Sequence, residues 1–417
     1  MSHVVGIVCE YNPFHNGHKA QIQYAREVLG ADYVIAAMSP DFTQRGQIAF
    51  FDKYCRTEAA LEYVDMVLEI PVMYSTASAE GYATAAIKVL AETGIVDTIL
   101  FSSENANPEL FNQVSSIILN ESDEYKSALQ NGLSNGESFA SARANAIKIC
   151  IKQPNNQLDD FLSLPNNILG LEYVKAIKKY YPDLNYETME RLGQSYHSNV
   201  SDDYYASATA IREALENNDE SAYIGVPSKL QDYYKKLIDD NLFLNFESVS
   251  QLLHLKIMEN DSFVKYLDCN EDISNKINKN KNNYVNLPQF IDLLKTKDVA
   301  YTRLSRIMCH ILLGITNDDV DYKNIRIPYN RVLGIAEDAT ALFTNMKKHS
   351  KILFFSSVKE IESALENDDC WDSTEHQKAA QRQYAISANS TNIYNILQTS
   401  VSANAALPEI CHKFIIK

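Results

Sequence analysis

The sequence predicts an α/β fold, with a doubly wound parallel sheet over residues 1–226 followed by a mostly α-helical domain over residues 227–417. Two observations predict this fold class. In the first part, short apolar runs rich in β-branched residues alternate with segments whose apolar residues recur at helical spacing, as in a parallel sheet covered on both faces. Beyond residue 227, helical spacing dominates. At 417 residues the chain is long enough for two domains, each with its own core.

The individual elements follow from the period of the apolar pattern and from the residues that interrupt it. Strands are expected at residues 4–9, 33–38, 66–70, 98–101 and 185–191. Helices are expected at 19–29, 53–63 and 79–91, across 109–151 with a break at 131–138, and from the turns at 164–170 and 204–213. The alternation of Lys and Asn at 275–283 predicts a solvated loop.

Composition narrows the function classes. No apolar run reaches the length of a membrane span and no export signal is evident, so we expect a cytoplasmic protein without a membrane partner. The seven cysteines are far apart and include no C-x-x-C pair, which argues against a disulfide framework and a zinc site. The net charge of -16 counts against a nucleic-acid-binding protein with a broadly basic surface, although a local basic groove is compatible with it.

The most informative stretch is EYNPFHNGH at residues 10–18, where the first strand turns into the first helix. Gly17 permits a ligand to approach the backbone closely, and the first helical turn offers unpaired N–H groups to an anion. The imidazoles of His15 and His18 can donate hydrogen bonds to phosphoryl oxygens as charge develops there. The stretch therefore predicts phosphoryl or nucleotidyl chemistry, with ordinary polar residues at a turn as the alternative.

The signature HNGH at residues 15–18 resembles the HxGH nucleotidyltransferase superfamily, in which the His pair stabilises the α-phosphate of ATP during adenylyl transfer. A two-His metal site is a further alternative. It lacks a convincing third ligand, because Cys9 lies within the strand and Glu10 is the only close carboxylate. We therefore expect no metal held by the protein itself.

A second group of phosphate-binding candidates is SATAIR at residues 207–212. Ser207 and Thr209 stand at a helix start and Arg212 lies on the next turn, an arrangement suited to the β- and γ-phosphates. The alternative is a plain helix N-cap, but neither hydroxyl residue is followed three positions later by Glu or Gln, so no capping box explains the group.

Two weaker candidates are the pair Asn166–Asn167 with Arg191 downstream, and Arg45 in the loop after the second strand. Adjacent Asn residues after Pro are usual in a turn, and a loop Arg is often a plain surface residue, so both have a structural alternative.

Further motifs carry a closer resemblance. They are the run at 5–18, DFTQRG at 41–46, DK at 52–53, LEIP at 68–71, SEN at 103–105, PNNILG at 165–170, SATAIR at 207–212, LKTK at 294–297, YTRLSR at 301–306 and YNRVLG at 329–334. Together they resemble the bacterial tRNA(Met) cytidine acetate ligase family over nearly the full chain, with the last three in that family's helical RNA-binding region.

The resemblance implies an ATP-dependent ligase with an HxGH nucleotidyltransferase-like, Rossmann-type sheet. Such an enzyme activates acetate as acetyl-adenylate and acetylates N4 of the wobble cytidine of elongator tRNA(Met), with Mg²⁺ accompanying ATP. Together with the residue chemistry above, it gives the catalytic residues His15, His18, Arg191 and Arg212. The expected ATP-binding residues are Val8, Cys9, Glu10, Tyr11, Asn12, Pro13, Phe14, His15, Asn16, Gly17, His18, Gln21, Ser102, Asn166, Arg191, Ser207 and Thr209. The expected tRNA-binding residues are Arg303, Arg306 and Arg331.

Other functions stay open. Ser102 and Pro40 stand where the family typically has Gly, and Asp298 stands where it often has a basic residue. These departures and the acidic composition favour an adenylyltransferase or acid-adenylating enzyme that acts on a small molecule. A nucleotide-sensing or RNA-binding protein without turnover is a third possibility, disfavoured because both phosphate-binding motifs are intact.

Overall fold

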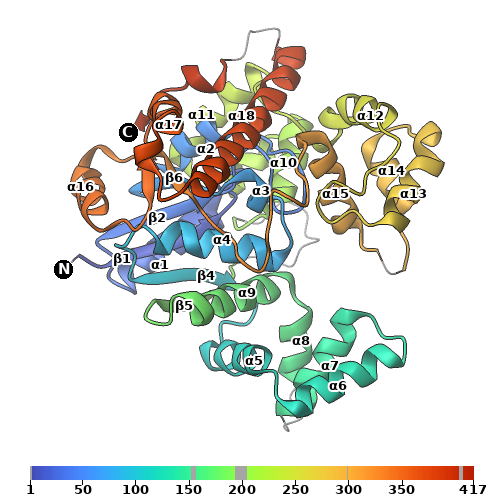
Figure 1. Ribbon diagram of the computed structural model, residues 1–417. Helices are drawn as coiled ribbons and strands as arrows, with labels where there is room; N and C mark the ends of the chain where they lie inside the picture. The colour runs from blue at the N-terminus through green and yellow to red at the C-terminus, as the bar shows by residue number, and fades with distance from the viewer. Residues whose placement is uncertain (1, 152–155, 193–203, 298, 403–406) are drawn as a thin grey trace.

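The computed structural model describes residues 2–151, 156–192, 204–297, 299–402 and 407–417. Within them, an eight-stranded sheet has the order β5-β4-β1-β2-β3-β6-β7, with β8 paired to β6 (Figure 1). Strands β1 to β5 are parallel, β6 is antiparallel to β3, and β7 and β8 are parallel to β6. The strands are β1 (Val4–Cys9), β2 (Tyr33–Met38), β3 (Met66–Glu69), β4 (Thr98–Ser103), β5 (Asn185–Glu190), β6 (Tyr329–Ile335), β7 (Leu353–Phe355) and β8 (Ile415–Ile416). The predicted α/β class is confirmed.

Helices cover both faces of the sheet. They are α1 (Asn16–Glu27), α2 (Lys53–Ala60), α10 (Ala208–Glu216) and α11 (Ser228–Asp239) on one face, with α4 (Ala79–Ala91) and α9 (Pro165–Tyr180) on the other. Successive side chains of β2 enter the two different cores, Val34 and Ala36 the first, Ile35 and Ala37 the second. A strand buried on both faces needs apolar residues at every position, which explains the unbroken apolar run of β2.

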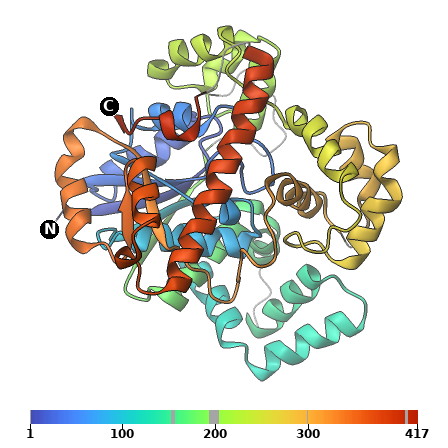
Figure 2. The same cartoon turned by 45° about the horizontal axis from the view of Figure 1, so that its top comes forward.

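Two groups of helices stand beside the sheet and its layers (Figure 1). The first contains α5 (Pro108–Asn120), α6 (Asp123–Ser134), α7 (Phe139–Ile151) and α8 (Asn156–Ser163), and the second α12 (Ser250–Met258), α13 (Glu271–Asn280), α14 (Leu287–Leu294) and α15 (Tyr301–Leu313). The remaining α-helices of the described residues are α3 (Val72–Ser75), which is short, and α16 (Thr340–His349), α17 (Val358–Leu365) and α18 (Thr374–Ser402). Figure 2 shows α18 as one long helix that crosses the molecule, and it packs against α3, α15 and α17. Among the helices described, none combines the length and the apolarity needed to cross a bilayer.

Strands β6, β7 and β8 belong to residues 227–417, for which the sequence predicts a mostly helical domain. Because β6 pairs with β3, a division at residue 226 does not separate the sheet from the helical part. The strand partners lie more than half the chain apart in sequence, so the local pattern of β6 gives no sign of its place in this sheet.

The predicted loop at 275–283 is wrong, because these residues form the end of α13 and the 3-10 helix Lys281–Asn283. The Asn270 side chain caps α13 by accepting a hydrogen bond of 3.0 Å from the N–H of Ile273. Ile273 and Ile277, one turn apart, are buried. The abundance of Lys and Asn on the other sides of the helix conceals this narrow apolar face.

Candidate active site

A cavity of about 540 Å³ lies at the carboxyl ends of the parallel strands. Strands β1 and β4 are neighbours, although the chain passes from β1 to β2 on the other side, so the strand order reverses between β1 and β4. Val8 and Cys9 of β1 and Phe101 and Ser102 of β4 line the cavity. In open α/β sheets ligands bind at such a switch point, which makes this cavity the candidate active site.

The two histidines of the HNGH signature line this cavity at the N-terminus of α1. His15 is the N-cap residue, and its Nδ1 accepts a hydrogen bond of 3.0 Å from the N–H of Gly17. The Nδ1 of His18 accepts a bond of 3.3 Å from the N–H of His15, which completes a capping box. The rings stack with their centroids 3.7 Å apart. Backbone hydrogen bonds therefore fix the orientation of both imidazoles.

Both imidazoles are neutral at physiological pH. Burial, reinforced by the charges of Arg191 and Arg212, lowers the pKa of His15 to about 3. Burial, together with His15 and Arg191, lowers the pKa of His18 well below its ordinary value. A neutral imidazole whose Nδ1 accepts a hydrogen bond carries its proton on Nε2. Each ring thus has one Nε2–H to donate to an anion.

Three residues of the predicted ATP-binding motif, Pro13, Phe14 and Asn16, are not among the residues that line the cavity. Phe14 is fully buried and its N–H donates to the hydroxyl of Tyr234, while the Nδ2 of Asn16 donates to the carbonyl oxygens of Tyr204 and Ile224. These side chains face the protein interior. They hold the turn that presents the histidines, and the structure gives them no contact with the cavity.

The remaining predicted ATP-site residues all line the cavity. They are Val8, Cys9, Glu10, Tyr11, Asn12, His15, Gly17, His18, Gln21, Ser102, Asn166, Arg191, Ser207, Thr209 and Arg212. They come from β1 and the turn after it, α1, β4, α9, the residue that follows β5 and the start of α10. The structure therefore brings together residues that are as many as 204 positions apart in sequence, from Val8 to Arg212.

The SATAIR group is both a helix cap and part of the cavity wall. Ser207 is the N-cap of α10 and accepts a hydrogen bond from the N–H of Ala210, as in the plain-cap alternative. Arg212 donates from Nη1 to the carbonyl oxygen of Asn12 at 2.6 Å and from Nη2 to the hydroxyl of Thr209. The N-termini of α1 and α10 both contribute to the wall, and each favours an anion.

Glu104 fixes Asn166 at the start of α9. Its Oε1 accepts hydrogen bonds from the backbone N–H and the Nδ2 of Asn166, at 3.2 and 2.7 Å, and its Oε2 accepts one from the N–H of Asn167 at 3.0 Å. In addition, the Oδ1 of Asn167 accepts from the N–H of Asn105. The carboxylate thereby caps a helix N-terminus and sets the direction of the Asn166 side chain, which lines the cavity.

The loop that carries Arg45 joins the cavity to α15. The N–H of Gln44 donates to the Oε1 of Glu10 at 3.0 Å, and Thr43, Gln44, Arg45 and Gln47 line the cavity. Gly46 has a φ of +69°, and a Cβ there would lie 2.6 Å from the Cα of Arg306 in α15. Only glycine fits this close approach, so the loop is held between the cavity and α15.

Sequence reasoning missed two kinds of site residue. The first kind is the apolar and aromatic lining, Ala79, Tyr82, Phe101, Ile168, Leu169, Tyr173, Met189, Leu192, Tyr205 and Ala206. The second is the fully buried Arg56 of α2, which donates to the carbonyl oxygens of Glu10, Ser39 and Pro40. The helical spacing of Tyr82 and Tyr173 is typical of any core helix, and nothing in the sequence indicates the acceptors of Arg56.

The three arginines predicted to bind tRNA lie in different settings. Arg303 is half-buried on α15 and donates to the carbonyl oxygen of Asp268 at 3.2 Å, and burial lowers the pKa of Arg306 on the same helix. Arg331 is 8% exposed and pairs with Glu69 and Glu409. The prediction for Arg331 is not supported, because its guanidinium is engaged inside the protein. Its cross-strand partner Glu69 is remote in sequence, so the motif alone did not reveal the pairing.

In the described part of the chain, no group of three or more His, Cys, Asp or Glu side chains is arranged to hold a metal ion. Glu10 is the one carboxylate among the described residues of the cavity wall, and one of its oxygens already accepts a hydrogen bond. Asp298, noted above as a departure from the family pattern, lies outside the described residues.

Comparison with known proteins identifies the family. The chain matches the family described as HIGH Nucleotidyl Transferase over residues 2–407. It is 36% identical over 365 residues to the tRNA(Met) cytidine acetate ligase of Clostridium kluyveri, covering 85% of this chain and 90% of that protein. It is 32% identical over 413 residues to the tRNA(Met) cytidine acetate ligase of Clostridium perfringens, covering 96% and 97%. The chain belongs to the tRNA(Met) cytidine acetate ligase family. The resemblance inferred from the motifs is confirmed.

Solved structures of this family share the fold. The crystal structure of Thermotoga maritima TmcAL in its apo form I has a TM-score of 0.91 and 28% identity to this chain. The crystal structure of the same protein bound with alpha-thio ATP has a TM-score of 0.88 and 27% identity. Both cover 100% of each chain. The second structure therefore contains this relative with an ATP analogue bound.

Proposed function

We propose that this protein is an ATP-dependent ligase that activates acetate as acetyl-adenylate and then acetylates N4 of the wobble cytidine of elongator tRNA(Met) in the cytoplasm. One observation carries the proposal for the first step. Two neutral imidazoles, each with its proton on Nε2, stand at a helix N-terminus in the cavity at the strand-order reversal. The names of the relatives favour tRNA as the acceptor over a small molecule.

In the first step a carboxylate oxygen attacks the α-phosphorus in line and pyrophosphate leaves. His15 and His18 donate from Nε2 to oxygens of the α- and β-phosphates, where negative charge develops. Arg212 and Thr209 face the departing pyrophosphate. The guanidinium of Arg212 is held in place by its hydrogen bonds to the carbonyl oxygen of Asn12 and to the hydroxyl of Thr209. Arg191, at the end of β5, holds a phosphate or the incoming carboxylate. Acetate is already ionised at neutral pH, so this step needs no general base.

Mg²⁺ fits this site as a partner of the phosphates. With Glu10 as the one carboxylate of the described wall, the ion would take most of its ligands from phosphate oxygens and water, which is its usual preference in nucleotide sites. When bound, it neutralises phosphate charge. The protein residues named above supply the positioning.

In the second step the exocyclic amine of cytidine attacks the acetyl carbonyl carbon of the mixed anhydride. The amide bond forms, the acyl–phosphate bond breaks, AMP leaves, and the amine loses one proton to solvent. A cytidine in a single-stranded anticodon loop can leave its stack and enter a pocket with aromatic walls, such as the one that includes Tyr82 and Tyr173. Arg303 and Arg306 lie on α15, which touches the Arg45 loop of the cavity through Gly46. We therefore place the RNA backbone along α15 and omit Arg331 from this surface.

The test uses two assays on the same preparations. The first is acetate-dependent ATP–pyrophosphate exchange, and the second is formation of N4-acetylcytidine in an elongator tRNA(Met) transcript. We expect His15→Ala and His18→Ala to abolish both activities, and Arg303→Ala to reduce only the second. Lys348→Ala, an exposed cation of α16 on the opposite side from α15 (Figure 1), is the matched control and should reduce neither. Exchange without acetyl transfer in the wild-type protein would favour the small-molecule alternative.

A further inference from the structure

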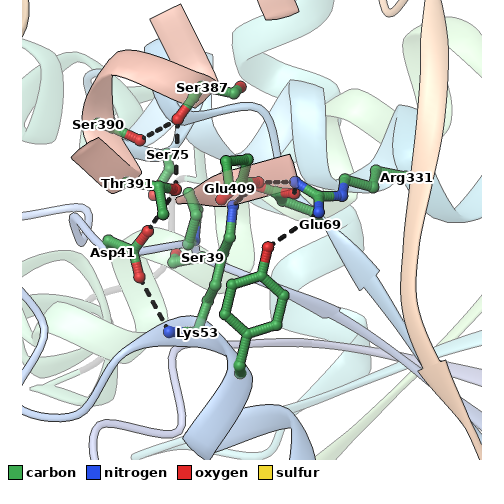
Figure 3. Close-up of polar contacts among 12 residues, drawn as sticks. Ser39, Asp41, Lys53, Glu69, Ser75, Arg331, Ser387, Ser390, Thr391 and Glu409 are labelled. Atoms are coloured by element: carbon green, nitrogen blue, oxygen red, sulfur yellow. Dashed lines mark hydrogen bonds and ion pairs between the residues drawn. The ribbon is translucent and has the colours of Figure 1, made fainter. Parts of the chain in front are cut away.

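A buried cluster of four charged side chains, drawn in Figure 3, does not line the cavity. Lys53, Glu69, Arg331 and Glu409 are respectively 0%, 4%, 8% and 4% exposed. They come from α2, β3, β6 and the 3-10 helix Glu409–Cys411 near the end of the chain. The adenylation chemistry proposed above uses none of them, so the cluster needs a separate explanation.

Glu409 connects the two cations of this cluster. Its Oε1 lies 2.8 Å from the Nζ of Lys53 and also bonds to the Nη1 of Arg331. Glu69 pairs with the same two cations, at 3.0 Å to Lys53 and 3.3 Å to Arg331. Two carboxylates thus balance two cations. Without Glu409, one positive charge would remain buried and uncompensated, which is far more costly than an exposed charge.

From Lys53 the contacts lead to the cavity. Lys53 is the first residue of α2, and its backbone N–H donates to the Oδ1 of Asp41 at 2.9 Å. Arg56, on the next turn of α2, donates to the carbonyl oxygen of Glu10 at 2.6 Å and to that of Ser39 at 2.9 Å. Glu10 lines the cavity and directly precedes the turn that carries the histidines. The position of α2 therefore sets the position of the cavity wall.

The helix α18, in the C-terminal part of the chain, contacts the loop between β2 and α2 that contains Asp41. The Thr391 hydroxyl donates to the Oδ2 of Asp41 at 3.0 Å, as Figure 3 shows. The hydroxyl of Tyr394 donates to the carbonyl oxygen of Phe50 at 3.0 Å, and the N–H of Phe50 donates to the Oδ1 of Asn12 in the cavity wall at 2.8 Å. Two separate paths of hydrogen bonds thus connect the last fifty residues to the nucleotide site.

We infer that Glu409 is a positioning residue for the ATP site and acts through Lys53 and Arg56, with Thr391 as a second support from α18. The inference rests on the proposed function only in that the cavity binds ATP. Loss of the Glu409 carboxylate leaves α2 with an unbalanced charge at its first residue. The helix then shifts, and Arg56 no longer holds the carbonyl oxygen of Glu10 in its place.

The decisive variant is Glu409→Gln, which keeps the size of the side chain and removes its charge. ATP binding is measured by calorimetry and the KM for ATP by pyrophosphate exchange, both well below the melting temperature of the variant. We expect ATP affinity to fall roughly tenfold, the scale typical when a group that orients a site residue is removed. Glu375→Gln, an exposed carboxylate at the start of α18, is the matched control and should bind ATP like the wild type.

A merely structural role predicts a different result. In that case Glu409→Gln would melt at a lower temperature with unchanged ATP affinity and unchanged KM, and this outcome would overturn the inference. If Glu409→Gln does not fold, Thr391→Val is used instead, because it removes the hydroxyl that donates to Asp41 and keeps the side-chain shape. A loss of ATP affinity in this variant supports the inference, and a retained affinity overturns it. Calorimetry needs neither acetate nor tRNA, so the failure of this inference is distinguishable from the failure of the proposed acetyl transfer.

Discussion

The neutral state of His15 has a measurable consequence for stability. In the unfolded chain an imidazole titrates near its ordinary pKa of 6.5, whereas in the folded protein burial and two arginines lower the pKa of His15 to about 3. Between these values the unfolded state binds a proton that the folded state does not, so the free energy of unfolding falls as the pH falls. Each pH unit below 6.5 costs about 1.4 kcal/mol, and at pH 5 the loss due to His15 is about 2 kcal/mol.

The perturbation that isolates this contribution is His15→Asn, because Asn is a good N-cap and retains an acceptor for the N–H of Gly17. Urea unfolding of the wild type and the variant, without nucleotide, gives the free energy of unfolding at pH 7.5 and pH 5. We expect the wild type to lose about 2 kcal/mol more than the variant between the two pH values. Groups that titrate equally in both proteins cancel in this comparison.

An equal pH dependence in the two proteins would refute the reasoning. It would mean that His15 takes up a proton in the folded state above pH 5. In that case the capping hydrogen bond from Gly17 to its Nδ1 would not persist, since a protonated imidazole has no acceptor. The assignment of Nε2 as the donor to phosphate would then fail with it.

Two further substitutions test the support of the cavity wall. Gly46→Ala should lower both the melting temperature and acetyl transfer, because the new methyl group meets the backbone of α15. The control is Gly136→Ala, at φ +81° with nothing within 4 Å, which carries only the backbone strain. Equal effects of the two substitutions would contradict a contact between Gly46 and α15. Glu104→Gln should weaken ATP binding by roughly tenfold, because an amide cannot accept hydrogen bonds at both of its heavy atoms and so releases Asn166. Glu109→Gln on the exposed face of α5 is its control, and a calorimetric affinity equal in both variants would contradict a role for Glu104.

Local signals in the sequence were sufficient for the parallel sheet and for the histidines. The β-branched run before EYNPFHNGH and the helical spacing after it depend only on neighbouring residues, and the structure has β1 and α1 there. By contrast, the antiparallel pairing of β6 with β3 and the burial of Arg331 depend on residues about 260 positions away. Contacts of this range carry no periodic signal in one sequence, so an exposed arginine and a buried one look the same.

The chemistry of individual site residues was predictable only where the residue type limits the choice. His15 and His18 lie at a strand-to-helix turn next to a glycine, where binding a phosphate is the role that suits their imidazoles best. Asn16, by contrast, has a side chain suited equally to ATP and to backbone carbonyl oxygens. The structure assigns it to the latter. Asn and Pro serve turns and ligands with the same groups, and a sequence does not say which partner they meet.

An acidic chain can bind anionic substrates, because the net charge describes the whole protein whereas binding depends on the charges close to the cavity. The net charge of -16 is a sum over all side chains, while a triphosphate in the cavity interacts mainly with charges within about 10 Å. The described residues of the cavity wall include three arginines, Arg45, Arg191 and Arg212, and one carboxylate, Glu10. Two helix N-termini add to the positive potential. A local excess of positive charge in a low-dielectric cavity outweighs distant, screened carboxylates. The acidic composition therefore argues against a broadly basic RNA-binding surface, but it does not argue against ATP binding in this cavity.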